Sequence, residues 1–518
     1  MKAGPALAFA AVLLLYSAPI GGNARVTPYP NEMPRILLAV SLAADRSIRL
    51  DRAVEAYGTE EDLALRDGHA YCDKAPGVSL AAAPIAWASA PILPRWGETR
   101  YPDYWPLRNL LTWLLSALPG ALLPFLSLRG RTPLAAGEPA LATLLAVTTP
   151  IFAYATTLFG HVPAAALVAA AWALALDGGR ERRRHGQVRM FVAGAAAGLA
   201  IATEYPTAIL MAVLVGAMIA GRRGAREISA FAVGAFLCLL PALAHNALAF
   251  GAPWATGYAF KAGARDAAIH ATGFAGIALP SAARLFGVLF SASRGLLFYC
   301  PLLLLAPPGL VAMARRDRPG ALALAAACCG YGLFAGGFVD WKGGWGAAAR
   351  HLVPIVPLLF VPVAHAVAGL RERAAGRALV AALAAVSLAN AILTLAVSPN
   401  FPASFEAPLA QVAVPCLRDG IAMPNALTAA FGIHPLVVAA LWAAAASALA
   451  AWALAGLLPS RRRLVWIPAT LVLCAAASVA IQWEASPGVT REQELVRAWY
   501  LERLGETAHA KEIWARPR

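Results

Sequence analysis

The sequence has little charge for its length of 518 residues. Asp, Glu, Lys and Arg together make up 14% of the chain, whereas 60% is hydrophobic and the mean hydropathy is +0.63. Soluble domains are closer to half apolar and a quarter charged, and disordered chains are less apolar still. The scarcity of charge therefore excludes soluble, disordered, collagen-like and disulfide-scaffold proteins, and it indicates an integral membrane protein.

Cysteine is also scarce, and its spacing is not that of a metal site. The seven cysteines include no pair separated by two residues and no zinc-type spacing with histidine, so no metal ligands are assigned. Cys72 and Cys416 fall in loops predicted to lie on the same side of the membrane. A disulfide between them is therefore possible, and the sequence does not decide it because it does not determine the distance between the two residues.

Acidic residues are outnumbered, with 28 Asp and Glu against 43 Lys and Arg. A basic excess is common in nucleic-acid-binding proteins, but here the basic residues form short clusters between apolar runs. Clusters of this kind orient a membrane protein, so no nucleic-acid partner is expected. The clusters are Arg129/Arg131, Arg180 to Arg184, Arg222/Arg223/Arg226, Arg315/Arg316/Arg318, Arg371/Arg373/Arg377 and Arg461 to Arg463.

Long apolar runs predict the fold. A helix needs roughly 20 mostly apolar residues to cross a bilayer, and the chain contains about 13 such runs. We therefore predict an all-α, polytopic transmembrane protein. The predicted spans lie near 5–21, 107–128, 139–158, 162–178, 190–203, 206–221, 228–250, 296–313, 320–338, 352–370, 378–396, 436–457 and 465–482.

The basic clusters predict the orientation. With the N-terminus in the cytoplasm, all six clusters fall on the cytoplasmic side, as the positive-inside rule requires. The first segment lacks a clear cleavage site, which favours an uncleaved anchor over a signal peptide. In a bacterial inner membrane, the periplasmic segments are then 22–106, 251–295, 339–351, 397–435 and the polar, helix-forming tail 483–518.

The first periplasmic loop, 22–106, is the longest. It contains an apolar segment near 78–93 that is interrupted by two prolines. A full span there would invert every later loop, so we predict an interfacial helix. The first loop also holds more of the acidic residues outside the cytoplasmic loops than any other segment, which points to chemistry at the outer membrane surface.

Three carboxylates of the first loop are candidate general bases. Glu32 opens an amphipathic stretch, where it either acts as a base at the mouth of a membrane cavity or lies on a capped surface helix. Asp51 follows in a run of alternating charges that is also typical of a solvated face, and Asp73 precedes Lys74. Lys74 stands beside a Pro-Gly turn, where it either binds a lipid phosphate or extends to the interface.

The later periplasmic turns supply candidate substrate-binding residues. Trp341 and Trp345 flank glycines and offer stacking faces for a sugar, and Arg350 suits a phosphate, although an interfacial aromatic belt is the alternative. Glu204, beside Tyr205, is a carboxylate between apolar runs, which is costly unless it is paired or hydrated. The remaining candidates are His161, Arg294 and Tyr299.

In order and topology, these motifs resemble the GT-C superfamily of membrane glycosyltransferases. The resemblance is to the branch of the protein O-mannosyltransferases and the lipid A aminoarabinose transferase, and it spreads over residues 1–400. It rests on Asn31-Glu32 early in the loop, on Asp73-Lys74-Ala75-Pro76-Gly77, on the stretch 294–301 and on the stretch from Gly344-Trp345 to Pro354. The segments 401–482 and 483–518 would then be additional C-terminal helices and a polar tail.

The resemblance implies an enzyme that takes a sugar from a polyprenyl-phosphate-linked donor. The acceptor would be a lipid, a glycan or a protein at the periplasmic face, and the anomeric configuration would invert. Glu32 would correspond to the base and Lys74 to the phosphate-binding residue. Family members often have two acidic residues where this chain has Asn31-Glu32, so Asp51 and Asp73 remain rival bases. Some members use a divalent cation, which we leave unassigned.

Two other functions use the same kind of lipid. A flippase or transporter of lipid-linked sugars would need polar residues inside its spans, and here these are few, such as His245, Asn246 and His365. An oligosaccharide ligase usually carries its large outer loop late in the chain. The early position of the large loop favours the transferase.

Overall fold

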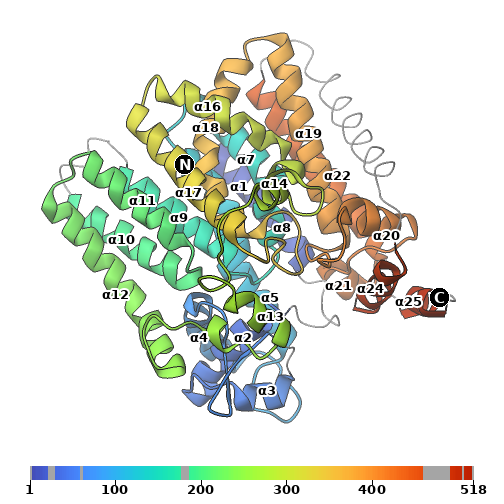
Figure 1. Cartoon of the computed structure of the whole chain (residues 1–518). Helices are drawn as coiled ribbons and strands as arrows, with labels where there is room; N and C mark the ends of the chain where they lie inside the picture. The colour runs from blue at the N-terminus through green and yellow to red at the C-terminus, as the bar shows by residue number, and fades with distance from the viewer. Residues whose placement is uncertain are drawn as a thin grey trace.

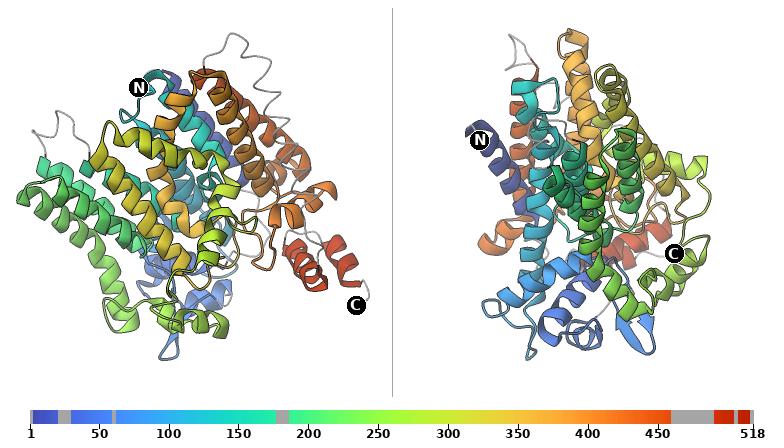
Figure 2. Two further views of the ribbon diagram at one scale, coloured as in Figure 1. Left: turned by 45° about the horizontal axis from the view of Figure 1, so that its top comes forward. Right: turned by 90° about the vertical axis from the view of Figure 1, so that its left-hand side faces the viewer.

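The computed structural model describes residues 3–20, 30–58, 62–176, 186–458, 490–503 and 507–515. Within these ranges the chain is mainly helical and its one sheet has two strands, which confirms the predicted all-α, polytopic architecture. Long helices run side by side through the upper part of the molecule, and the first loop gathers below them (Figure 1). Two further views keep the first loop at the same end (Figure 2).

Seven helices among the described residues are long and apolar enough to span a membrane. They are Tyr104–Leu128 (α5, Tyr104–Thr112; η3, Trp113–Ala117; α6, Leu118–Leu128), α10 (Gly186–Thr203), α12 (Ala225–Phe250), α17 (Arg318–Gly337), Arg350–Leu370 (η8, Arg350–Ile355; α18, Val356–Leu370), α19 (Ala374–Val397) and α22 (Pro435–Leu457).

Shorter helices cover the other predicted spans. They are α1 (Ala3–Ile20), α7 (Glu138–Thr148) with α8 (Pro150–Tyr154), α9 (His161–Leu176), α11 (Thr207–Ala220), and α15 (Leu296–Tyr299) with η7 (Pro301–Leu305) and α16 (Ala306–Ala314). Every predicted span thus coincides with helix, except 465–482, which lies outside the described residues.

The first loop folds into its own small core. Its elements are α2 (Met33–Val40), η2 (Ser41–Asp45), α3 (Asp51–Tyr57), β1 (Ala64–Arg66), β2 (His69–Tyr71) and α4 (Gly77–Ser89). β1 and β2 pair antiparallel around an Asp67-Gly68 turn in which both residues have positive φ, as a tight hairpin turn requires. The apolar side chains of α2 are fully buried against α4, and α4 is the helix predicted near 78–93.

The remaining elements belong to loops and to the C-terminal part. They are η4 (Ala135–Gly137), η6 (Gly257–Phe260), α13 (Ala264–Ala271), α14 (Ala282–Phe290), η9 (Leu409–Ala413), α20 (Val414–Arg418), α21 (Ala426–Phe431), α24 (Arg491–Arg503) and α25 (Thr507–Ala515). α24 and α25 share a hydrophobic core with the segment around 401–421, and α24 confirms the predicted helix in the polar tail.

Glycines let α10 and α12 pack backbone against backbone. A Cβ atom added at Gly194 would lie 1.9 Å from the Phe231 carbonyl oxygen, and one at Gly198 would lie 2.2 Å from that of Ala235. Close approach through small residues is a common way for membrane helices to associate, because lipid supplies no hydrophobic driving force between them.

We expect Gly194→Leu to destabilise the protein by about 1–3 kcal/mol, because the added side chain must separate α10 from α12. The midpoint of thermal unfolding in detergent measures this effect. Gly216→Leu is the matched control, since Gly216 is a glycine of α11 with open space where its Cβ would be. Equal midpoints for the two variants would contradict the close packing.

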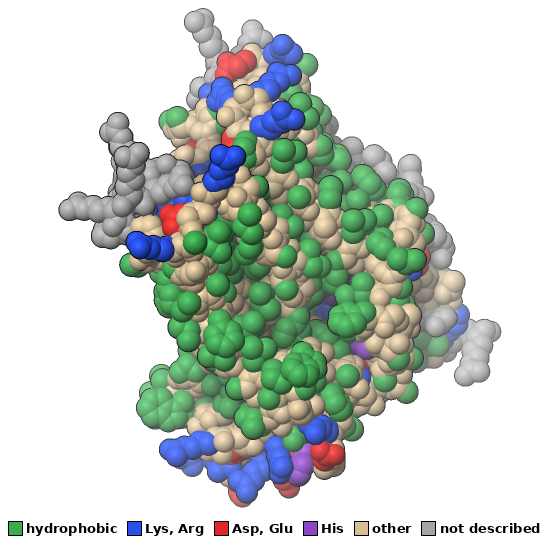
Figure 3. Space-filling model, turned by 60° about the vertical axis from the view of Figure 1, so that its left-hand side comes forward, with side chains coloured by type: hydrophobic (Ala, Val, Ile, Leu, Met, Phe, Trp, Pro, Cys, Tyr) green, Lys and Arg blue, Asp and Glu red, His purple; other side chains and the backbone are tan. Residues whose placement is uncertain are grey.

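The surface of the helical part has an apolar band. On the face that carries α10 and α12, hydrophobic side chains cover the middle, and charged side chains gather at both ends (Figure 3). Exposed apolar residues of these helices include Phe191, Leu199, Phe236 and Leu240. This distribution is that of a protein whose helices are surrounded by lipid.

Candidate functional site

Helix ends and turns converge on Glu204 at the first-loop end of the spans. Glu204 lies in the turn between α10 and α11, His161 begins α9, and Arg35 is in the first turn of α2. Arg350 and His351 begin η8. We call these five residues the Glu204 site.

Two glycines make this convergence possible. A Cβ atom at Gly160 would lie 2.3 Å from Oε1 of Glu204, and one at Gly77 would lie 2.6 Å from the carbonyl oxygen of Ala202. Only a residue without a side chain therefore allows the start of α9 and the start of α4 to approach the end of α10 so closely.

Glu204 is largely buried but only loosely bonded. Its side chain is 12% exposed, and its Oε1 lies 3.3 Å from Nη2 of Arg35 and 3.4 Å from Nδ1 of His161. Burial raises the pKa of Glu204, and the positive charges of Arg35, Arg350 and Lys74 offset only part of this shift. The carboxylate therefore takes up a proton more readily than an exposed glutamate.

Several nitrogen atoms of the Glu204 site are buried without a hydrogen-bond partner among the described residues. Buried polar atoms are normally bonded, so such a group indicates space for a polar ligand. These atoms are Nε of Arg35, Nε2 of His161, Nε of Arg350 and Nε2 of His351.

A four-residue ion cluster joins the first loop to the 251–295 loop. Nζ of Lys74 is 2.5 Å from Asp62 and 2.8 Å from Asp73, and Nζ of Lys261 also contacts both carboxylates. Asp73 is fully buried and Lys74 is 8% exposed. Lys261 belongs to the 251–295 loop, so the cluster fastens that loop onto the first loop.

The charges of the cluster stabilise one another. Burial disfavours the charged form of Asp62, but the two lysines outweigh burial and hold the pKa of Asp62 well below its usual range. Burial likewise opposes the charge of Lys261, and the two carboxylates raise the pKa of Lys261 instead. Burial and the charge of Asp62 raise the pKa of Asp73, and the two lysines offset only part of this shift. Lys74 is thus already paired where the sequence suggested a free phosphate ligand.

Glu32 forms a buried bidentate ion pair. Nε and Nη2 of Arg108 lie 3.0 and 2.8 Å from its two carboxylate oxygens, and the backbone N–H of Leu158 donates to Oε1 at 2.7 Å. Glu32 and Arg108 are each 1% exposed. The carboxylate thus joins the start of α2 to α5 and to the segment before α9, with both oxygens occupied.

Asp51 holds the hairpin of the first loop. One carboxylate oxygen, Oδ2, lies 2.8 Å from Nδ1 of His69. The other, Oδ1, accepts a 2.8 Å hydrogen bond from the backbone N–H of Ala70. Its side chain is 42% exposed. The structure therefore separates the three predicted bases: Glu32 and Asp51 tie segments of the first loop, and Asp73 belongs to the ion cluster.

Arg294 is fully buried and binds backbone carbonyl groups. Its Nη2 donates to the carbonyl oxygens of Gly344 at 3.2 Å, Phe401 at 3.1 Å and Pro402 at 3.3 Å, and its Nε donates to that of Lys342 at 3.3 Å. It thereby fixes the glycine-rich turn before Arg350.

The other aromatic candidates also pack against neighbouring elements. The ring centroids of Trp345 and of Trp499 in α24 are 4.7 Å apart, and the rings meet edge to face. Trp341 lies against Gly287 of α14. The hydroxyl groups of the two tyrosines donate within the fold, from Tyr205 to Oδ1 of Asn246 at 3.1 Å and from Tyr299 to the carbonyl oxygen of Ser293 at 3.4 Å.

The two cysteines of the periplasmic loops, Cys72 and Cys416, are buried in different hydrophobic cores. Burial raises the pKa of the Cys72 thiol to about 12. Within the described ranges, no three His, Cys, Asp or Glu side chains are arranged to hold a metal ion.

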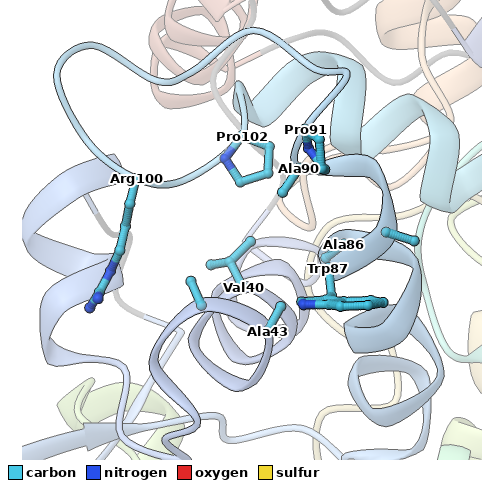
Figure 4. A pocket seen from close by; sticks show the side chains of 10 residues that line it. Val40, Ala43, Ala86, Trp87, Ala90, Pro91, Arg100 and Pro102 are labelled. Atoms are coloured by element: carbon cyan, nitrogen blue, oxygen red, sulfur yellow. The ribbon is translucent and has the colours of Figure 1, made fainter.

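A separate groove of about 470 Å³ lies between η2, the end of α4 and the loop before α5. Its wall is apolar, with Val40, Trp87 and Pro91, and Arg100 stands across from them (Figure 4). Arg100 is paired with Asp45. The groove contains none of the Glu204 site.

Sequence analysis did not identify several residues of the Glu204 site, the ion cluster and the Glu32 ion pair. They are Arg35, Asp62, Arg108, Lys261 and His351. Arg108 carried a signal, because an arginine inside a predicted span requires a partner. Lys261 carried none, since its partner Asp62 is 199 residues away in the sequence.

The fold and site together define a polytopic helical membrane protein with a cationic, buried site under its first loop. No protein-family model matches the chain, and no curated protein does. Among solved structures, it is similar to ArnT from Cupriavidus metallidurans bound to undecaprenyl phosphate, with TM-score 0.45, 15% identity, and coverage of 93% of this chain and 80% of that one.

The apo state of ArnT from Cupriavidus metallidurans is similar to the same extent, with TM-score 0.46, 16% identity, and coverage of 92% and 77%.

Proposed function

We propose that the protein is a membrane glycosyltransferase. It would take a sugar from a polyprenyl-phosphate-linked donor and transfer it, with inversion, to a lipid, glycan or protein acceptor at the periplasmic face of a bacterial inner membrane. The observation that carries the proposal is a set of buried nitrogen atoms around Glu204 that have no hydrogen-bond partner among the described residues, at the end of the spans opposite the basic loops.

The charge of the Glu204 site suits such a donor. Arg35 and Arg350 contribute two positive charges and Glu204 one negative charge, so the site carries one net positive charge. The phosphodiester of a polyprenyl-phosphate sugar carries one negative charge. A guanidinium binds phosphate oxygens in bidentate fashion, and burial strengthens that attraction.

Arg350 is the most available cation of the site. Its Nη1 donates to the carbonyl oxygen of Trp345 at 3.3 Å, and its Nε has no partner among the described residues. None of its contacts within those residues is an ion pair. Lys74, by contrast, would reach a phosphate only by exchanging contacts with Asp62 or Asp73.

We expect Arg350→Gln to weaken binding of polyprenyl phosphate by at least about tenfold, because an unpaired cation near the phosphate is lost. Removing Arg350 breaks no ion pair among the described residues, so we expect the variant to keep its fold. Equilibrium binding of polyprenyl phosphate to the purified protein in nanodiscs measures the effect.

Arg315→Gln is the control, since Arg315 is an exposed arginine in the loop between α16 and α17. Equal affinities of the Arg350 and Arg315 variants would contradict a phosphate site at Arg350. Movement of lipid-linked sugar across liposomes without release of polyprenyl phosphate would instead identify a flippase.

A further inference from the structure

We infer that Glu204 is the general base of the proposed transfer, and that its protonation releases Arg35 to the departing phosphate. This inference rests on the proposed function. It assigns the proton to a carboxylate outside the first loop and explains why that carboxylate is paired loosely.

Glu204 is more available than the carboxylates of the first loop. Both oxygens of Glu32 and both oxygens of Asp51 are occupied. Oδ1 of Asp73 has no hydrogen-bond partner among the described residues, but Asp73 is 0% exposed, whereas the Glu204 side chain is 12% exposed. Oε2 of Glu204 has no hydrogen-bond partner among the described residues, and the contacts of its Oε1 are 3.3 Å or longer. An acceptor hydroxyl can therefore donate to Glu204 without displacing a strong bond.

The reaction balances with this assignment. The oxygen of the acceptor hydroxyl forms a bond to the anomeric carbon, and its proton moves to Glu204. The bond between the anomeric carbon and the phosphate oxygen breaks, and its electron pair leaves with polyprenyl phosphate. The proton then returns from Glu204 to solvent or to the released phosphate.

The charges balance as well. The donor phosphodiester has one negative charge and the leaving phosphomonoester has two. Before transfer the Glu204 site carries one net positive charge, and after Glu204 takes the proton it carries two. Neutral Glu204 no longer attracts Nη2 of Arg35, and Nε of Arg35 already lacks a partner among the described residues. These two nitrogens can then face the new charge, while Nη1 keeps its hydrogen bonds to Asn31.

The titration of Glu204 depends on its burial and on the groups of the elements packed around it. Burial favours its protonated form and so raises its pKa above that of an exposed glutamate. The ratio kcat/KM should then rise with pH as Glu204 loses its proton. The titratable and charged groups facing it from the packed elements are Arg35 of α2, Lys74, His161 of α9, Tyr205, Tyr258 of η6, Tyr331 of α17 and Arg350 of η8.

Glu204→Gln tests the inference with two readouts. Transfer, followed as release of polyprenyl phosphate in nanodiscs with a membrane extract as acceptor, should fall by about 10²–10⁴-fold. Binding of polyprenyl phosphate should tighten, because the amide mimics the protonated acid and leaves both guanidiniums uncompensated. If Glu204 had only a structural role, the Glu204→Gln variant would lose both transfer and binding of polyprenyl phosphate. Glu204→Gly with added formate is the second variant, and formate should restore part of the transfer.

The outcomes separate the two proposals. Full transfer by Glu204→Gln, or lost transfer with weakened binding of polyprenyl phosphate and no rescue by formate, would overturn the inference while the transferase proposal stands. Absence of release by the wild type with every donor tested would overturn the transferase proposal and the inference with it.

Discussion

Glu32→Gln is expected to destabilise the protein by about 3–5 kcal/mol, because it removes the carboxylate charge that pairs with the buried Arg108 guanidinium. Arg108 is 1% exposed and donates to both oxygens of Glu32. The neutral amide keeps one acceptor but cannot offset the cost of a buried charge. The free energy of unfolding in detergent micelles measures the loss.

Asp51→Asn is the matched control, since Asp51 is also a first-loop carboxylate that the sequence offered as a base. Its pair with His69 is partly exposed, and such pairs contribute about 0–1 kcal/mol. If Glu32→Gln kept wild-type stability but lost transfer, Glu32 would be the base and the account given for Glu204 would be wrong.

Arg294→Met is expected to have the second large effect. The guanidinium donates to backbone carbonyl groups of the 342–344 turn and of the 401–402 segment, which lie in different loops. Its loss would leave several buried carbonyl oxygens unbonded, at about 1–3 kcal/mol each for those that water does not reach. The midpoint of thermal unfolding should fall, and binding of polyprenyl phosphate should weaken because Arg350 follows this turn.

Lys342→Met is the control for Arg294. Lys342 joins the same two segments through Glu406 at 2.6 Å and the carbonyl oxygen of Ala403 at 3.2 Å, but its partner Glu406 is 64% exposed. An exposed pair contributes little, so this variant should behave as wild type. If Lys342→Met lowered the unfolding midpoint as much as Arg294→Met, the large effect of Arg294→Met could not be attributed to burial of the guanidinium.

The spans could be predicted from sequence because each is a local property. An apolar run of sufficient length has few alternatives in a membrane, and the described predicted spans all coincide with helices. The β-hairpin carried its own signal in Asp67-Gly68, which was not used. The close packing of α10 on α12 depends on which glycines face each other, and that is settled only in three dimensions.

The site was predictable only in part. Glu204, His161 and Arg350 stood out because each is polar at the end of an apolar run, and the structure brings them together. Which carboxylate is free was not predictable, because the partners are distant: Arg108 is 76 residues from Glu32. The local sequence shows that a residue is charged. Whether its charge is paired depends on residues that only the fold brings next to it.

The most direct test of the central claim is release of polyprenyl phosphate by the purified wild-type protein in nanodiscs. A panel of polyprenyl-phosphate sugars is supplied with a membrane extract, and the acceptor is examined for the added mass of a sugar. The account predicts release matched by sugar gained on the acceptor, and loss of both in Glu204→Gln. Release at equal rates in wild type and Glu204→Gln, or movement of intact donor across the membrane without release, would contradict it.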